Sequence, residues 1–175
     1  MAKNLMLAST IALDGVLMYS GTAQDTGVDP FYPTDYNSGS SSSIEVVDSC
    51  LGRTDYSGTY YYRTASPCLQ VSYIPIVGAE CTQCKLNMKQ YFNEQIRSFS
   101  LPVVGLTKSG HVVYGPYWPG NGSKVGGNVL DSCNGWFMPN PDTASSTKWL
   151  YGYVATEYHP YGPACFGPAN WPERE

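Results

Sequence analysis

Cys81 and Cys84 have the spacing of a redox-active dithiol in the segment Cys81-Thr82-Gln83-Cys84. In a redox site, a helix N-terminus lowers the thiol pKa, and the motif lies in a βαβ unit. A helix is predicted nearby, over Lys85 to Arg97, but no alternation of strands and helices surrounds the motif. We therefore favour a structural disulfide bond between Cys81 and Cys84, with a redox role as the alternative.

Two histidines, His111 and His159, complete the candidates for metal or acid–base chemistry. Neither belongs to a His-x-x-x-His spacing or to a His–carboxylate motif. The interpretation as packing or surface histidines is favoured over a metal pair or a general base.

The chain also has no glycine-rich phosphate loop, no paired carboxylates and no serine in a nucleophile-elbow setting. We predict no catalytic residue, no metal, no cofactor and no enzyme.

Asn121-Gly122-Ser123 is the only N-glycosylation sequon in the chain. It lies in a segment rich in proline and glycine, where a glycosyltransferase has access. The serine run Ser38–Ser43 is a candidate for O-linked glycans, with a plain flexible loop as the alternative. These features predict a glycoprotein.

Several aromatic residues lie close to predicted loops, where flat rings stack on sugars or mark contact surfaces. The alternative is that they belong to the core. The candidate stacking residues are Trp118, Trp136 and Trp149, together with Tyr117 and Tyr161.

Composition narrows the class of protein further. The 175 residues include 10 Lys and Arg against 14 Asp and Glu, a net charge of −4, which argues against a nucleic-acid partner. Six cysteines in a chain with 14% charged residues indicate disulfide bonds formed in an oxidising compartment.

No apolar run reaches the ~18 residues of a membrane span. Lys3 and the apolar residues after it resemble a signal peptide, but the repeat below makes them a strand, so we expect any signal peptide to lie outside this sequence.

Three blocks of sequence occur twice in the same order. The first block is a turn followed by an apolar strand that ends in Tyr and by a glycine-containing segment. The second block is Asp-Ser-Cys-x-Gly. The third block has tyrosines two positions apart, which places their rings on one face of a strand. The paired blocks are Leu13–Gly21 with Lys108–Pro116, Val47–Arg53 with Leu130–Trp136, and Gly58–Thr64 with Tyr151–Thr156.

These blocks predict an all-β fold with little helix, in which two pseudo-repeats form a compact, disulfide-stapled body like a sandwich or a barrel. Residues 1–68 are the first repeat, 69–99 a connector with the CxxC motif, and 100–175 the second repeat, the two repeats packing as one domain. Val71–Val77 is strand-like but contains Pro75, which places it at an edge. Val28–Pro33 and Trp118–Ser123 are predicted to be surface loops.

The same blocks resemble the YHYH-domain proteins of eukaryotic microbes and bacteria. The best matches are Val46–Cys68, with its Gly-x-Tyr-x-Tyr core, and Val104–Pro168, which contains Tyr114-Gly115-Pro116-Tyr117. The resemblance covers about nine tenths of the chain. It marks a family by sequence pattern and implies no particular activity.

The chain departs from that motif where a His follows each tyrosine. These four positions hold Tyr61, Arg63, Gly152 and Val154. Alternate histidines on one strand face are suited to binding a transition metal, so this departure removes any metal site that the motif implies.

The repeat also suggests how the cysteines pair, among 15 possible schemes. Cys50 corresponds to Cys133 and Cys68 to Cys165. The simplest symmetric scheme is Cys50–Cys68 and Cys133–Cys165, which leaves Cys81 with Cys84.

We predict a secreted or cell-surface structural glycoprotein whose subunits self-associate, with extracellular filaments as one form of assembly. An open strand edge is a template for pairing with another chain, and head-to-tail contacts build filaments. The contact elements expected are Met1–Leu13 and the Ala169–Glu175 tail. An extracellular module that binds carbohydrate or another ligand is the alternative.

Overall fold

The computed structural model describes residues 8–19, 21, 29–32, 44–70, 79–96, 103–117, 123–139 and 149–168. The described strands are β1 (Ala8–Ala12), β2 (Leu17–Tyr19), β3 (Gly52–Thr54), β4 (Tyr60–Tyr62), β5 (Val103–Thr107), β6 (Val112–Tyr114), β7 (Gly135–Pro139) and β8 (Trp149–Val154). They are joined by one α-helix, α1 (Thr82–Ile96), and by two 3-10 helices, η2 (Pro67–Leu69) and η3 (Gly127–Val129). The predicted all-β class with little helix is confirmed.

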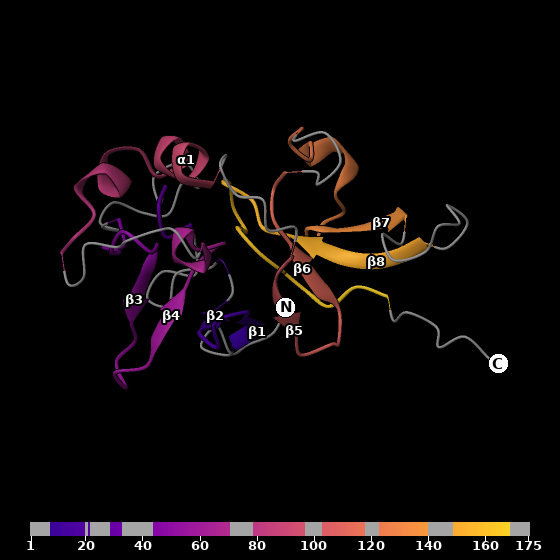
Figure 1. The fold of residues 1–175 in the computed structure, drawn as a ribbon, viewed down its shortest axis with the longest axis horizontal. Coiled ribbons are helices and arrows are strands. Elements are labelled where there is room, and N and C mark those ends of the chain that lie inside the picture. Colours follow the sequence, from indigo (N-terminus) through magenta and orange to yellow (C-terminus); the bar gives the residue numbers. More distant parts are fainter. Residues whose placement is uncertain are drawn as a thin grey trace.

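All eight strands belong to one sheet, in the order β3-β4-β2-β1-β5-β6-β8-β7. At its centre β1 and β5 pair antiparallel. Outward from this pair, both sides have an antiparallel, then a parallel, then an antiparallel pairing. Figure 1 shows β3 and β4 on one side of the central strands and β7 and β8 on the other. The compact, disulfide-stapled all-β body predicted from the sequence is thus built mainly from one eight-stranded sheet, whose edge strands are β3 and β7.

Corresponding turns in the two halves have the same backbone geometry. Gly15, between β1 and β2, has φ 87°, and Gly110, between β5 and β6, has φ 81°. Each lies in the left-handed region, where a residue without a Cβ is favoured. Each donates its N–H to the last residue of the preceding strand, at 2.9 Å to Ala12 O and 3.0 Å to Thr107 O. The turn dipeptides of the sequence thus form equivalent tight turns.

The close approach of β1 and β5 depends on Gly105. A Cβ at this position would overlap the backbone carbonyl oxygen of Ile11. We expect Gly105→Ala to force the two central strands apart and to lower the free energy of unfolding by about 2–3 kcal/mol. Urea unfolding, followed by tryptophan fluorescence, measures this change.

Gly162→Ala is the matched control, because a Cβ at Gly162 has no heavy atom within 4 Å. We expect its unfolding midpoint to stay close to that of the unmodified protein. Equal midpoints for Gly105→Ala and Gly162→Ala would contradict the close approach at the centre of the sheet.

Helix α1 lies over the first-half side of the sheet (Figure 1). It begins at Thr82 rather than at the predicted Lys85, and its non-helical residue is Asn87. Leu86, the first apolar residue of the predicted helix, does not belong to the buried face, since it is 81% exposed. The observed buried face has helical spacing and consists of Cys84, Met88, Tyr91, Phe92 and Ile96.

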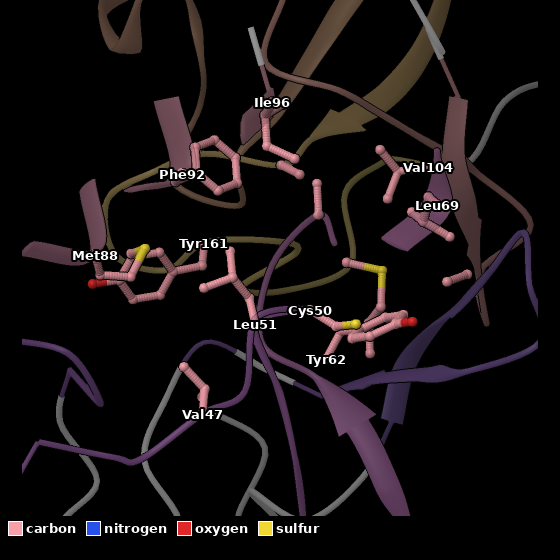
Figure 2. Packing of buried hydrophobic residues seen from close by; sticks show 14 of the residues in the cluster. Val47, Cys50, Leu51, Tyr62, Leu69, Met88, Phe92, Ile96, Val104 and Tyr161 are labelled. Carbon is pink, nitrogen blue, oxygen red and sulfur yellow. The ribbon is translucent and has the colours of Figure 1, made fainter. Parts of the chain in front are cut away.

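One continuous core joins the helix to both halves of the sheet. Figure 2 shows Met88, Phe92 and Ile96 of α1 in the same cluster as Leu51 of the first half and Tyr161 of the second. Among the described residues, no helix has the length and apolar character that crossing a membrane requires.

The segment 29–32 corrects the prediction of a surface loop over Val28–Pro33. It was expected in a surface loop, but Asp29 and Phe31 are only 3% and 2% exposed. The ring of Phe31 meets the ring of Tyr161 edge-on, with centroids 5.1 Å apart. Tertiary contact with the chain after β8 therefore buries this proline-containing segment.

Candidate ligand pocket

A pocket of about 300 Å³ lies where the chain after β8 meets helix α1 and the segment 29–32. Its walls thus come from parts of the chain that are far apart in sequence. The lining residues are Asp29, Tyr32, Lys89, Glu157, Tyr158, His159 and Tyr161.

The buried carboxylate of Asp29 fixes one wall of the pocket. Its Oδ1 accepts hydrogen bonds from the backbone N–H groups of Phe31 and Tyr32, at 2.8 and 3.0 Å. The same oxygen accepts a hydrogen bond from the hydroxyl of Tyr161 at 2.7 Å. Asp29 therefore ties the 29–32 segment to the turn after β8.

Glu157 forms a second acidic wall and is 5% exposed. Its Oε1 pairs with the ammonium group of Lys124, and this ammonium also donates to Asn93 Oδ1 at 2.8 Å. The other carboxylate oxygen, Oε2, is buried and accepts no hydrogen bond within the described part of the chain. Glu157 thus keeps one unsatisfied acceptor.

Tyr158 and His159 follow directly along the chain. The buried hydroxyl of Tyr158 has no hydrogen-bond partner among the described residues, and burial, together with the charge on Glu157, raises the pKa of this tyrosine. Desolvation lowers the pKa of His159 below its usual 6.5, while the charge on Asp29 opposes the shift. Burial therefore favours the neutral form of the His159 imidazole.

Helix α1 contributes the cationic side of the pocket through Lys89. The hydroxyl of Tyr32 accepts a hydrogen bond from the backbone N–H of Lys89 at 3.1 Å. With Lys124 behind Glu157, two ammonium groups balance the two carboxylates of Asp29 and Glu157. The pocket therefore has mixed donors and acceptors and little net charge.

The acidic residues of the two Asp-Ser-Cys loops are fully engaged in structural hydrogen bonds. Asp48 Oδ1 accepts from the N–H groups of Cys50 and Gly52 at 2.9 and 3.0 Å, and its Oδ2 accepts from the hydroxyl of Tyr60 at 2.7 Å. Asp131 is bonded in the same way. Its Oδ1 accepts from the N–H groups of Cys133 and Gly135, and its Oδ2 accepts from the hydroxyl of Tyr151 at 2.7 Å. These carboxylates position the tyrosine strands and have no role in the pocket.

His111 is a packing residue, in line with the favoured interpretation. It is 4% exposed, and its ring meets the rings of Tyr151 and Tyr153 edge-on at 5.4 and 5.8 Å. Its Nδ1 lies 2.9 Å from Ser109 Oγ. In the part of the chain that the structure describes, no group of three or more His, Cys, Asp or Glu side chains is arranged to hold a metal ion.

The structure contains the disulfide bonds Cys50–Cys68, Cys81–Cys84 and Cys133–Cys165, which are the pairs predicted from the repeat. Cys81 and Cys84 stand at the start of α1 and are 8% and 2% exposed. Their burial restricts attack by an external thiol and supports the structural interpretation over the redox alternative.

The predicted sugar-stacking residues do not form one described surface. Trp136 is half-buried on β7, and Tyr117 is half-buried after β6. Tyr161 was expected near a loop surface, but it is fully buried, because its hydroxyl bonds to Asp29 and its ring packs on Phe31. Outside the described residues lie Trp118, Asn121, Ser38–Ser43, the Val71–Val77 segment, residues 1–7 and 169–175, and the side chain of Trp149.

Comparison with known proteins gives no match to a family model, to a curated protein or to a solved structure. The pocket and the fold therefore define the class directly: a disulfide-linked protein with one eight-stranded sheet and a polar pocket beside it.

Sequence reasoning missed the pocket residues Asp29, Glu157 and Lys89. Of the pocket residues, the sequence singled out His159, as a candidate for metal or acid–base chemistry, and Tyr161, as a candidate stacking residue.

Proposed function

We propose that the protein is an extracellular or cell-surface structural protein whose subunits associate through the exposed face of the central strands. The observation that carries this proposal is an apolar row across four strands, Leu17, Ile11, Leu106 and Val112, which stand opposite one another in register. Ile11 and Leu106 are 47% and 48% exposed. Paired residues share a face of the sheet, so the row is a continuous apolar surface.

The opposite face of the same strands is already covered. Met18, Val104 and Val113 are no more than 1% exposed in the core. A sheet whose central strands are apolar on both faces normally has cover on both. Completing the burial of each exposed side chain contributes roughly 1 kcal/mol. Association therefore has a physical driving force at this row.

A second copy of the chain is the partner that best fits the row. Leu17 corresponds to Val112, and Ile11 to Leu106, in the two halves of the sheet, so the row has approximate two-fold symmetry. No charged residue belongs to it, and a two-fold contact requires a surface complementary to itself. The open edge of β7, with Phe137 50% exposed, offers a further contact by which dimers extend into filaments.

The extracellular setting rests on the three disulfide bonds, which persist in oxidising compartments. Glycosylation at Asn121 is part of the same proposal. Mass spectrometry of material from the native source, before and after glycosidase treatment, tests it.

Sedimentation velocity, with electron microscopy of the same samples, tests self-association. We expect dimers or larger assemblies of the unmodified protein and a monomer for Leu106→Glu, because the new carboxylate cannot be buried in the contact without a partner. Leu86→Glu is the control, since Leu86 is 81% exposed on α1, and it should leave assembly unchanged. A monomeric unmodified protein at all accessible concentrations would refute the proposal.

Ligand binding is the second candidate function, and the pocket beside α1 is the observation that favours it.

A further inference from the structure

We propose that the pocket between α1 and the turn after β8 binds a neutral polyhydroxyl ligand, one sugar residue in size. This inference rests on the second candidate function and is independent of self-association. It assigns the pocket to a carbohydrate, whether as a free sugar or as the end of a glycan chain.

The polar lining of the pocket is the first reason. Asp29 and Glu157 contribute carboxylates, and Lys89 contributes an ammonium group. A ligand hydroxyl donates to a carboxylate and accepts from an ammonium group, so a polyhydroxyl ligand suits a lining that mixes acceptors and donors.

The balance of charge is the second reason. An anionic ligand would meet the carboxylates of Asp29 and Glu157, and a cationic ligand would meet the ammonium group of Lys89. A neutral ligand avoids both repulsions. Its hydroxyl oxygens can accept hydrogen bonds from Lys89 while its hydroxyl protons go to the carboxylates.

Size and rigidity are the third reason. A volume of about 300 Å³ lies at the lower end of the range for ligand pockets and suits a single sugar ring. The walls are held in place before any ligand arrives, since Asp29 is fixed by three hydrogen bonds and Tyr32 is bonded to the backbone of α1. A preformed site of this kind loses little entropy on binding.

The test is an NMR titration of the disulfide-intact, isotope-labelled protein with glucose, galactose and N-acetylglucosamine, in parallel with glycine, methylamine and acetate. We expect at least one sugar to shift the backbone signals of residues 157–161 and Lys89, with a millimolar Kd. Short oligosaccharides that carry the same terminal sugar distinguish a glycan end from a free sugar. A titration in which only glycine or a charged probe shifts these signals overturns the assignment to carbohydrate, and one in which no probe shifts them overturns the site.

Variants locate the binding. Glu157→Gln keeps the shape of the side chain but weakens the acceptor, and we expect Kd to rise about tenfold. Lys89→Ala, on the exposed surface of α1, should raise Kd severalfold without loss of folding, and it decides the question if Glu157→Gln does not fold. Lys108→Ala removes the same charge in the β5–β6 turn and should leave Kd unchanged. Equal losses in Lys89→Ala and Lys108→Ala would contradict binding in the pocket.

Discussion

Arg63→Met is expected to lower the free energy of unfolding by about 3–5 kcal/mol, because it breaks a buried ion pair and leaves the Glu45 carboxylate with only the more distant, partly exposed Arg53 as its counter-ion. The Arg63 side chain is 0% exposed. Its Nε donates to Glu45 Oε2 at 2.8 Å, and its Nη2 donates to Glu45 Oε1 at 2.6 Å, so the guanidinium holds the carboxylate at both oxygens. Urea unfolding at pH 7 measures the loss.

Aromatic stacking adds to the cost of removing this guanidinium. Its carbon lies 4.9 Å from the ring centroid of Tyr61. That ring stacks in turn on Tyr19, with centroids 4.2 Å apart and planes 9° apart. A cation–π contact of this kind contributes roughly 1–2 kcal/mol where water is excluded. A methionine fills much of the same volume but supplies no charge.

Arg53→Met is the matched control for Arg63→Met. Arg53 also pairs with Glu45, at 3.5 Å, but its side chain is 34% exposed. Its loss should cost less than about 1 kcal/mol. The double variant Glu45→Gln/Arg63→Met should recover part of the stability, because it also removes the largely buried carboxylate that has lost its closer partner. Similar costs for the two single arginine variants would show that Arg63 is not the buried partner.

The ion pair gives a physical reason for one departure from the YHYH motif. Tyr61 and Arg63 stand where that motif has histidines, and both are completely buried. A stacked ring and a paired guanidinium occupy these positions, so the first half of the sheet uses them for packing. Membership of the YHYH-domain family itself stays a prediction.

The local features of the fold were predictable because short-range geometry dictates them. Asp-Ser-Cys-x-Gly specifies a loop in which one carboxylate accepts from two N–H groups and a tyrosine hydroxyl, and the structure forms it at Asp48 and again at Asp131. The glycine of each loop is required because a Cβ at Gly52 or Gly135 would overlap the tyrosine hydroxyl. The disulfide pairs followed from the same blocks of sequence.

The pocket and the single sheet were not predictable, since both depend on contacts between distant segments. The hydrogen bond between Asp29 and Tyr161 joins residues 132 positions apart. Nothing in the sequence near Asp29 distinguishes a buried capping carboxylate from one in a surface loop. Likewise, alternating strands are compatible with one sheet or two, and the antiparallel pairing of β1 with β5 decides for one.

Alkaline pH is expected to unfold the protein cooperatively between about pH 10 and 12. Burial raises the pKa of Tyr61 to about 12. The pKa values of Tyr60, Tyr62 and Tyr151 are raised still further. Burial is the largest cause for each, and the second is a hydrogen bond to Asp48, Asp14 and Asp131, respectively. In the unfolded chain these tyrosines ionise near pH 10, so the folded state holds their protons more tightly. Their contribution to stability is complete below pH 10 and is lost as the pH rises toward the folded pKa values.

The size of this loss follows from the number of tyrosines involved. Each contributes up to about 1.4 kcal/mol per pH unit, so the four together remove on the order of 5–10 kcal/mol by pH 12, which is comparable to the whole stability of a typical domain. The chain has 15 tyrosines, and exposed ones such as Tyr56 ionise without unfolding. The phenolate absorbance of the buried tyrosines should therefore appear as a steep additional step that coincides with the change in far-UV circular dichroism. Tyr151→Phe should reduce the pH dependence of the unfolding free energy by about 1.4 kcal/mol per pH unit, because one titrating group is gone. Complete phenolate formation, from all 15 tyrosines, in a protein that stays folded would show that the buried hydroxyls are accessible to solvent and are not held by the aspartates.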